Sequence, residues 1–257
     1  MLQRRARKMN VPENFEIREL RAIGDLAEAV RLQQRIWEFD DIDLVPLRMF
    51  VVVTRIGGQA LGAFEKGRMI AFCLCLPGLK PGRQSYLHSH MLGVLPEYRN
   101  SGAGRRLKFK QREDALTQGI PLIEWTFDPL EIKNAFFNIE RLGAVARRFV
   151  HNQYGATSSR LHGGLPTDRL IAEWWIGSAR VAAVQSGEPP NSFPIEARIS
   201  VPARIAEFRE HEPARAREIQ SSVAEQFERH FRDGLAVIGF ERTPEAGVYL
   251  LAPWDSK

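Results

Sequence analysis

One stretch near the middle of the chain decides the fold: Val94-Leu95-Pro96-Glu97-Tyr98-Arg99-Asn100-Ser101-Gly102-Ala103-Gly104-Arg105-Arg106-Leu107. A predicted strand, Ser85–Leu95, runs through a proline turn into Arg-x-x-Gly-x-Gly, and the charged segment Ala103–Gln118 follows. Glycines let the backbone approach a ligand closely, and the first amides of a helix are unpaired donors. The sequence therefore predicts a strand, a turn and a helix whose N-terminus binds an anion.

Three arginines crowd this predicted helix N-terminus, namely Arg99, Arg105 and Arg106. The helix dipole makes positive charge unfavourable there unless a bound anion offsets it. The alternative is a tight turn followed by a solvated basic helix face. The chain lacks the Gly-x-x-x-x-Gly-Lys-[Ser/Thr] pattern of a P-loop, and this turn differs from the Gly-x-Gly-x-x-Gly of a dinucleotide site. We therefore exclude ATPase and Rossmann functions.

Apolar periodicity predicts the elements on either side of the turn. Strands are expected at Phe15–Leu20, Gln59–Glu65, Met69–Leu76, Ser85–Leu95, Leu122–Phe127, Arg147–Tyr154 and Arg169–Ile176. Helices are expected at Ile23–Trp37, Pro46–Arg55, Ala103–Gln118 and Glu131–Leu142, although Pro46–Arg55 fits a strand equally well. The Gly- and Pro-containing stretch Ser186–Ser192 is the strongest boundary signal. After it we expect a strand at Ile195–Val201, a helix at Pro213–Arg232 and strands at Ala236–Glu241 and Val248–Leu251.

Composition narrows the class of protein. The 257 residues are 44% hydrophobic and 26% charged, and 36 basic against 31 acidic residues give a net charge of +5. No stretch approaches the ~18 uninterrupted apolar residues of a membrane-spanning helix. The basic N-terminal run lacks the apolar region of a secretory signal, so we expect a cytoplasmic protein. Cys73 and Cys75 lie two apart in an apolar run, where they suit buried thiols better than a disulfide.

The sequence around the glycine turn resembles a known enzyme family. Val94-x-Pro-x-Tyr-Arg99-x-x-Gly102-x-Gly104 is similar to the acetyl-CoA motif of the GNAT N-acyltransferases, and Arg141-Leu142-Gly143-Ala144 resembles the family's next motif, with alanine where phenylalanine is usual. The resemblance covers roughly Phe15 to Ile176 and points to a larger, sparsely characterised branch. It implies an α/β fold with a central mixed, largely antiparallel sheet, splayed around an acyl-CoA groove and flanked by helices.

The resemblance also implies where acetyl-CoA or another acyl-CoA binds. Pantetheine would run beside the strand at Leu92, Gly93 and Val94. The pyrophosphate would lie on the turn and helix start, at Arg99, Asn100, Ser101, Gly102, Ala103, Gly104 and Arg105. Asn134 and Asn138 stand one helical turn apart, and either bind pantetheine amides or are solvated on the helix surface.

Catalysis in such a site is direct attack of an amine on the thioester, helped by a base. Many relatives protonate the leaving thiolate with a tyrosine, but here that position is Ile139. His88 and His90 share a strand face, and His88 stands where some relatives carry a glutamate base, so an imidazole titrating near neutrality is our first choice. Glu124 is the second candidate, with Asp128 beside it. The histidines lack partners at metal-ligand spacing, so we expect no metal.

These observations predict an acyl-CoA-dependent N-acyltransferase that moves an acetyl, succinyl or other short acyl group to a small-molecule amine, with an amino acid as one candidate. The alternative is a non-catalytic CoA-binding or regulatory module. A specific nucleic-acid partner is not expected, because the charge excess is modest and no recognition motif is present. We divide the chain into a basic flexible tail (1–13), an acyl-CoA-binding core (14–177) and a C-terminal αββ extension packed on it (178–257), and we consider a homodimer.

Overall fold

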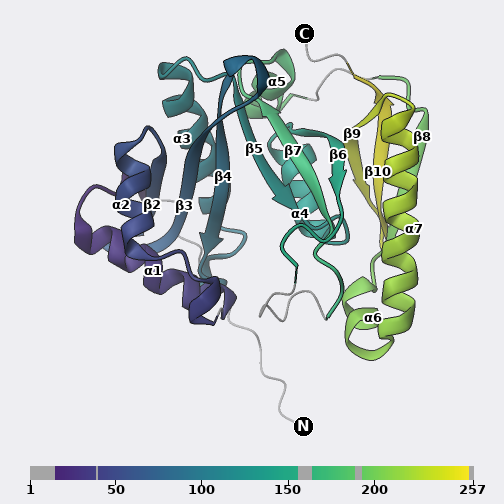
Figure 1. The fold of residues 1–257 in the computed structure, drawn as a ribbon, viewed down its shortest axis with the longest axis horizontal. Coiled ribbons are helices and arrows are strands. Elements are labelled where there is room, and N and C mark those ends of the chain that lie inside the picture. The colour runs from purple at the N-terminus through teal and green to yellow at the C-terminus, as the bar shows by residue number, and fades with distance from the viewer. Residues whose placement is uncertain (1–14, 39, 156–163, 189–192, 255–257) are drawn as a thin grey trace.

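The computed structural model describes residues 15–38, 40–155, 164–188 and 193–254 (Figure 1). The predicted tail, 1–13, lies outside the described residues, as does part of the predicted boundary stretch. The strands are β1 (Glu16–Glu19), β2 (Gln59–Glu65), β3 (Arg68–Leu79), β4 (Ser85–Val94), β5 (Leu122–Phe127), β6 (Val145–Val150), β7 (Arg169–Trp175), β8 (Ala197–Pro202), β9 (Leu235–Arg242) and β10 (Ala246–Pro253). The helices are α1 (Ile23–Trp37), α2 (Leu47–Arg55), α3 (Ala103–Thr117), α4 (Ile132–Phe136), α5 (Ala179–Ser186), α6 (Ile205–His211) and α7 (Pro213–Arg232).

Within the described residues the strands form one sheet in the order β1-β2-β3-β4-β5-β7-β6-β9-β10-β8. Only β4 and β5 pair in parallel, and every other neighbouring pair is antiparallel. In Figure 1, α1 and α2 lie together at one end of the sheet and α7 lies along the strands at the other end. The expected mixed, largely antiparallel sheet flanked by helices is confirmed.

Strands β2 and β3 are buried because α1, α2 and α3 cover them. Apolar side chains of β2 and β3 form one cluster with residues of these helices, including Leu26, Phe50 and Leu107. Cys73 and Cys75 are free and fully buried in β3, as their apolar surroundings predict. Lys66 and Gly67, with φ of 48° and 80°, make the tight turn from β2 to β3, a conformation that glycine adopts without strain.

Some elements differ from the expectation. The sequence does not predict α5 or α6, both of eight residues or fewer, because so short a helix shows little periodicity. The helix expected at Glu131–Leu142 starts as α4 and continues as a π-helical segment, Phe137–Arg141. The strand expected to reach Tyr154 ends at Val150, because Asn152 takes a positive φ of 41° and the chain turns.

The C-terminal part of the chain continues the same sheet. Ala146 of β6 pairs with Val237 of β9, and the apolar face of α7 covers these strands. The Phe227 ring is stacked on Phe149 at 6.0 Å and meets the Tyr249 ring edge-on at 5.0 Å. The strand expected at Ile195–Val201 is present as β8, and the short helices α5 and α6 also precede α7, so this part is richer than the expected αββ arrangement. The division into core and extension stays a prediction.

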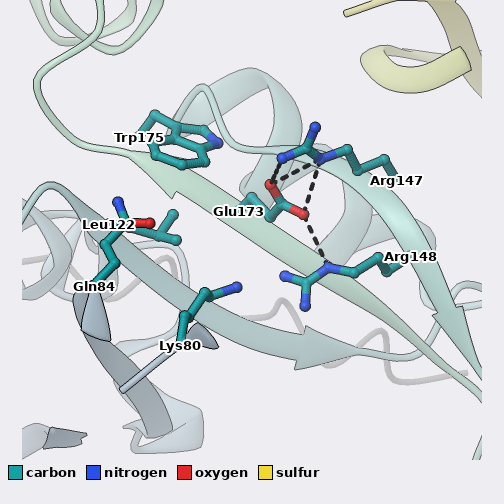
Figure 2. Close-up of a pocket in the computed structure, with 7 residues that line it drawn as sticks. All are labelled: Lys80, Gln84, Leu122, Arg147, Arg148, Glu173 and Trp175. Atoms are coloured by element: carbon teal, nitrogen blue, oxygen red, sulfur yellow. Dashed lines mark hydrogen bonds and ion pairs between the residues drawn. The ribbon is translucent and has the colours of Figure 1, made fainter. Parts of the chain in front are cut away.

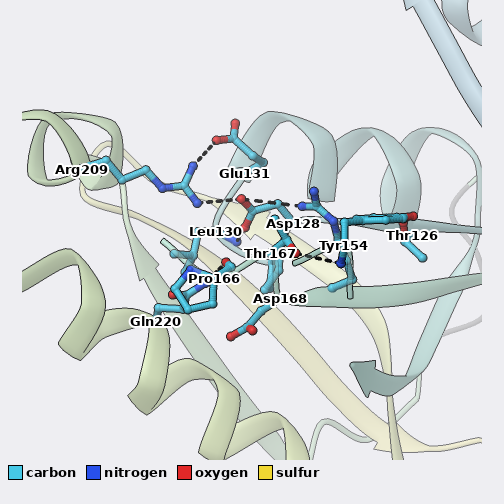
Figure 3. A network of polar contacts seen from close by, with 12 residues as sticks. Thr126, Asp128, Leu130, Glu131, Tyr154, Pro166, Thr167, Asp168, Arg209 and Gln220 are labelled. Atoms are coloured by element: carbon cyan, nitrogen blue, oxygen red, sulfur yellow. Dashed lines mark hydrogen bonds and ion pairs between the residues drawn. The ribbon is translucent and has the colours of Figure 1, made fainter. Parts of the chain in front are cut away.

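A buried polar network joins α6 to the end of β5 (Figure 3). Arg209 donates to Asp128 at 2.7 Å and to Glu131 at 2.6 Å, and Asp128 also accepts from the Leu130 amide at 2.8 Å. Arg169 lies 3.9 Å from the same Asp128 carboxylate. Asp128 is thus a structural carboxylate in this fold, rather than a free base.

In the described part of the chain no helix is long and apolar enough to cross a membrane.

Candidate functional site

The strands β4 and β5 part in the middle of the sheet. Their parallel pairing has two register pairs, Leu87 with Ile123 and His88 with Glu124. Beyond His88, strand β4 pairs with β3 alone, and a β-bulge leaves His90 between the pairs Cys75–Ser89 and Leu74–Met91. Bulges bend a strand and increase its twist. The bulge therefore turns the C-terminal half of β4 away from β5, and the expected splay is present at the expected strands.

The turn after β4 ends in a helix N-terminus with free donors. Asn100 and Gly102 have φ of 65° and 85°, which asparagine and glycine tolerate. The first backbone hydrogen bond of α3 runs from the Arg106 amide to the Gly102 carbonyl at 3.0 Å. The amides of Gly104 and Arg105 therefore have no acceptor among the described residues. An anion above α3 would satisfy both amides.

Gly93 and Gly104, both predicted to bind the cofactor, differ in the space that the protein leaves around them. A Cβ on Gly104 would lie 3.6 Å from Val94, 3.7 Å from Leu92 and 4.0 Å from Phe137, which are ordinary contacts. The protein's own packing leaves room for a side chain there. A Cβ on Gly93 would come within 2.8 Å of Ile36 and 2.9 Å of Trp37, so α1 itself requires that glycine. The close approach of α1 accounts for Gly93 without a ligand.

The arginine side chains do not gather at the helix N-terminus as expected. Arg105 donates to the carbonyls of Arg141 (3.3 Å) and Val184 (3.1 Å), and Arg106 lies over the Phe15 ring at 4.1 Å. Carbonyls at the C-terminal ends of helical segments attract cations. In this structure the side chains of Arg105 and Arg106 have these protein partners, and their interaction with an anion stays a prediction. Arg99 is exposed beside the turn.

The two predicted asparagines lie in contact but in different environments. The Asn138 amide is buried, accepts a hydrogen bond from Trp125 Nε1 at 3.2 Å and donates to Asn134 at 3.3 Å. Asn134 is exposed. Asn138 is thus committed to holding Trp125, and Asn134 keeps its amide nitrogen for other partners. Ile139, in the position of the usual tyrosine, is fully buried.

The sequence did not indicate the burial of Lys108, which lies beneath the same region. It is on α3, four residues after Gly104, and only 2% of it is exposed. Its ammonium donates to Ser89 Oγ at 2.7 Å and lies 3.6 Å from the centre of the Trp125 ring. Burial lowers the pKa of this lysine from 10.5 to about 8. The signal in the sequence was a lysine on the helix face that also carries Gly104, Leu107 and Gln111.

His88 is half-buried on the sheet face opposite α3, because its neighbour Ser89 faces Lys108 of that helix. Burial is the main cause that lowers its pKa from 6.5 to about 4, and the nearby His90 and Lys108 add to it. The two imidazole rings are 5.9 Å apart. The expectation that His88 titrates near neutrality is therefore wrong, and its ring is neutral throughout the physiological range.

Glu124 lies on the same face as His88, since the two residues are register partners in parallel strands. It is buried, and one of its carboxylate oxygens accepts from Lys80 at 2.5 Å and from Arg148. Its strand partner Glu173 is also buried and accepts from Arg147 and Arg148 (Figure 2). These charged residues surround a pocket of about 340 Å³ lined by Lys80, Gln84, Leu122, Arg147, Arg148, Glu173 and Trp175.

No group of three or more histidine, cysteine or acidic side chains able to hold a metal occurs among the described residues. His151 and His211 are exposed and far from this arrangement in the chain, with His151 hydrogen-bonded to Glu228 at 2.7 Å. What the fold brings together at the end of the β4–β5 pairing is a neutral histidine, a cation-bound carboxylate and a charged pocket. The free amides of α3 lie at the other end of β4.

The sequence profile of the acetyltransferase (GNAT) family matches residues 26–143, from α1 to the glycine after the π-helical segment. These residues belong to the acetyltransferase (GNAT) family. The match includes the glycine turn, β5 and both asparagines, so the family motif and the parting of β4 and β5 fall in one GNAT domain. No curated protein matches the sequence.

Solved structures share the fold of the GNAT domain. One is the ribosomal-protein-S18-alanine N-acetyltransferase from Escherichia coli, with a TM-score of 0.51 and 18% identity over 65% of this chain and 96% of that chain. Another is yncA from Salmonella typhimurium with its cofactor acetyl-CoA, with a TM-score of 0.52 and 16% identity over 64% and 96%. A third is NAA60 from Arabidopsis thaliana in complex with a bisubstrate analogue, with a TM-score of 0.50 and 15% identity over 63% and 98%.

Proposed function

We propose that this protein is an acyl-CoA-dependent N-acyltransferase that moves an acetyl or other short acyl group, succinyl among them, to the amine of a small molecule. The observation that carries the proposal is the parting of β4 from β5 beside a helix N-terminus whose amides are free. An amino acid is one candidate acceptor. The match of the GNAT domain to an acetyltransferase family supports the proposal, as does the similar fold of a protein solved with acetyl-CoA.

The residues present fit an acyl-CoA at this position. The amides of Gly104 and Arg105 are donors without protein acceptors, and Gly104 leaves room for a phosphate where a Cβ would otherwise stand. Asn100, Ser101, Gly102 and Ala103 complete the turn beneath the pyrophosphate. Leu92 and Val94, whose side chains face Gly104, would lie against pantetheine together with Asn134.

His88 is the residue we assign to the amine proton. An amine acceptor is protonated at neutral pH and attacks the thioester only after it loses that proton. A base with a pKa of about 4 is too weak to take that proton from a free ammonium, which loses it to solvent. The neutral imidazole has a free lone pair that then accepts the next proton, directly or through a water, as the nitrogen attacks the thioester and becomes acidic. Glu124, held by Lys80 and Arg148, positions the amine beside His88. The thiolate leaves without a tyrosine donor, which is acceptable because a thiol with a pKa of about 8.5 is a tolerable leaving group.

The test is a screen of amine pools with acetyl-, propionyl- and succinyl-CoA, followed by mass spectrometry for N-acyl products and by release of the CoA thiol. We expect one acyl-CoA and one class of amine to give product and free thiol in equal amounts. Tight CoA binding without turnover of any amine would instead favour the non-catalytic CoA-binding module. The cytoplasmic location and the homodimer stay predictions.

A further inference from the structure

We infer that the pocket between Lys80, Arg147 and Trp175 binds the acceptor through a carboxylate, so that the acceptor is an amine that carries a carboxylate close to it, as an α-amino acid does. The inference rests on the proposed function and deepens it, because it assigns the substrate class to a site. It stands on the position of the pocket, its charge and its size.

The pocket lies where an acceptor must approach. Lys80 and Arg148, which line it, both bind the Glu124 carboxylate, and Glu124 is the register partner of His88. A small molecule in this pocket therefore has the proposed base at one end. The free amides of α3 lie at the opposite end of β4, so the pocket and the phosphate-binding turn do not compete for the same space.

The charges of the pocket select an anion. Lys80, Arg147 and Arg148 are three cations against the two carboxylates of Glu124 and Glu173, which leaves a formal charge of 3 − 2 = +1. An amino acid matches this arrangement, because its carboxylate pairs with the excess cation while its amine lies toward Glu124. Once the amine has lost its proton, the bound acceptor carries the one negative charge that balances the pocket. A diamine would add positive charge to a pocket that already has an excess.

The arginines keep donors for a ligand. Arg147 contacts the Glu173 carboxylate through Nε and Nη2. Arg148 donates from Nε to Glu173 and from Nη2 to Glu124. Within the described residues, neither Nη1 has an acceptor. The side chains are 38% and 40% exposed, so these nitrogens lie at the boundary with solvent. A guanidinium fork binds a carboxylate with defined geometry.

The size and the walls of the pocket favour a small acceptor with an apolar side chain. Its volume of about 340 Å³ is at the lower end of the range for small-molecule sites, about 300–1,000 Å³. Leu122 and Trp175 form its apolar wall, opposite the arginines (Figure 2). Leucine and phenylalanine are therefore suitable probes.

The experiment compares matched acceptors in the full-length protein with the acyl-CoA that supports turnover. Each set contains the amino acid, its amide and the amine without the carboxyl group: phenylalanine, phenylalaninamide and 2-phenylethylamine, then leucine, leucinamide and 3-methylbutylamine, with both enantiomers of the chiral members. We expect kcat/KM for an amino acid to exceed that for its partners by about tenfold or more, which corresponds to the loss of one charged contact.

Variants locate this preference in the pocket. Arg147→Gln and Arg148→Gln should raise KM for the amino acid about tenfold or more and reduce its advantage over the amine, while CoA affinity stays unchanged. Arg148→Lys, which keeps the charge, should retain part of the advantage. Arg198→Gln is the matched control. Arg198 is exposed on β8, pairs with Glu241 of β9 at 2.8 Å, and does not line the pocket.

The failures are distinguishable. Equal use of 2-phenylethylamine and phenylalanine, or an unchanged preference in both arginine variants, would overturn the carboxylate site while leaving the acyltransferase intact. If no amine is acylated, the proposed function fails. The carboxylate site is then tested by isothermal calorimetry, which measures the binding of phenylalanine and of leucine to the CoA-bound protein. Binding that Arg148→Gln weakens would support it, and no binding of either amino acid would overturn it.

Discussion

At the scale of single residues, His88 is the group on which the chemistry depends most. Replacing it with alanine should lower kcat/KM by roughly 10²–10⁴-fold, the usual contribution of general acid–base catalysis. Because its pKa is lowered to about 4, activity carried by His88 should have its acidic limb near pH 4 instead of near 6.5. A pH–rate profile of the wild type and of His88→Ala checks both points.

His230→Ala is the control for that substitution, since His230 is half-buried like His88 but lies on α7. An alanine variant at position 88 with near-full activity and the wild-type acidic limb would move the proton acceptor to Glu124 or to a water. Ile139→Tyr should change little, because the buried position at 139 is filled by packing.

Lys108 gives a second residue-scale prediction, on stability. Burial lowers its pKa from 10.5 to about 8, so the folded protein holds its charge at a cost that is complete below pH 8 and disappears as the pH rises to 10.5. Lys108→Met should therefore be at least as stable as the wild type at pH 7, and this advantage should shrink between pH 8 and 10.5. Urea unfolding at pH 7 and pH 9.5 measures it; a less stable methionine variant with the same pH dependence as the wild type would contradict the assignment.

Residue patterns in the sequence placed His88 and Glu124 on two successive predicted strands, and the structure has them in register. The same patterns could not give the pKa of His88, because its burial depends on elements far away in the chain. They also did not show that Lys108 is buried, since a charged residue on a charged helix indicates a solvated face unless the packing is known.

At the scale of elements, the prediction concerns the N-terminus of α3. Gly104→Ala and Gly104→Val should both leave the fold intact, because a Cβ meets only ordinary contacts there. CoA should bind more weakly, on the order of tenfold for valine, since inserted methyl groups in a close-packed contact cost about 1–3 kcal/mol. Isothermal calorimetry with CoA measures the change.

Gly24 provides the matched control, because a Cβ on this α1 glycine meets nothing within 4 Å. Gly24→Val should bind CoA like the wild type. Equal CoA affinity in the wild type and in a folded Gly104→Val variant would show that the pyrophosphate does not lie on this turn.

Among the elements, the strand–turn–helix at the centre followed from its own residues, as did α1 and α7, whose apolar stripes are long. The β-bulge at His90 could not be predicted from the sequence, because it arises from how β4 pairs with β3. The short α5 and α6 were missed, although Ser178 caps α5 by accepting from the Val181 amide and Gly187 ends it with a φ of 81°. Those two residues are the signal that was available.

At the scale of the whole molecule, the C-terminal part is held to the GNAT domain by apolar packing and by Arg209. Arg209→Met should destabilise the protein by about 3–5 kcal/mol, because it leaves the buried Asp128 carboxylate without its main partner. Arg204→Met, which removes an exposed ion pair at the start of the same helix, should change stability little. Urea unfolding of both variants makes the comparison, and equal stabilities would mean that the polar network contributes nothing to docking α6.

The overall architecture was predictable as far as the family resemblance reached, because the order of elements and the glycine turn are encoded locally. The joining of β6 to β9, which makes one sheet of both parts, could not be foreseen, since a pairing between residues 146 and 237 depends on the packing of everything between them.

The most direct test of the central claim is a crystal structure of the protein with CoA. We expect the pyrophosphate on the amides of Gly104 and Arg105, pantetheine beside Leu92 and Val94, and the thiol near His88 and Glu124. CoA bound elsewhere on the molecule, with the turn at Gly102 and Gly104 free of phosphate, would contradict the account.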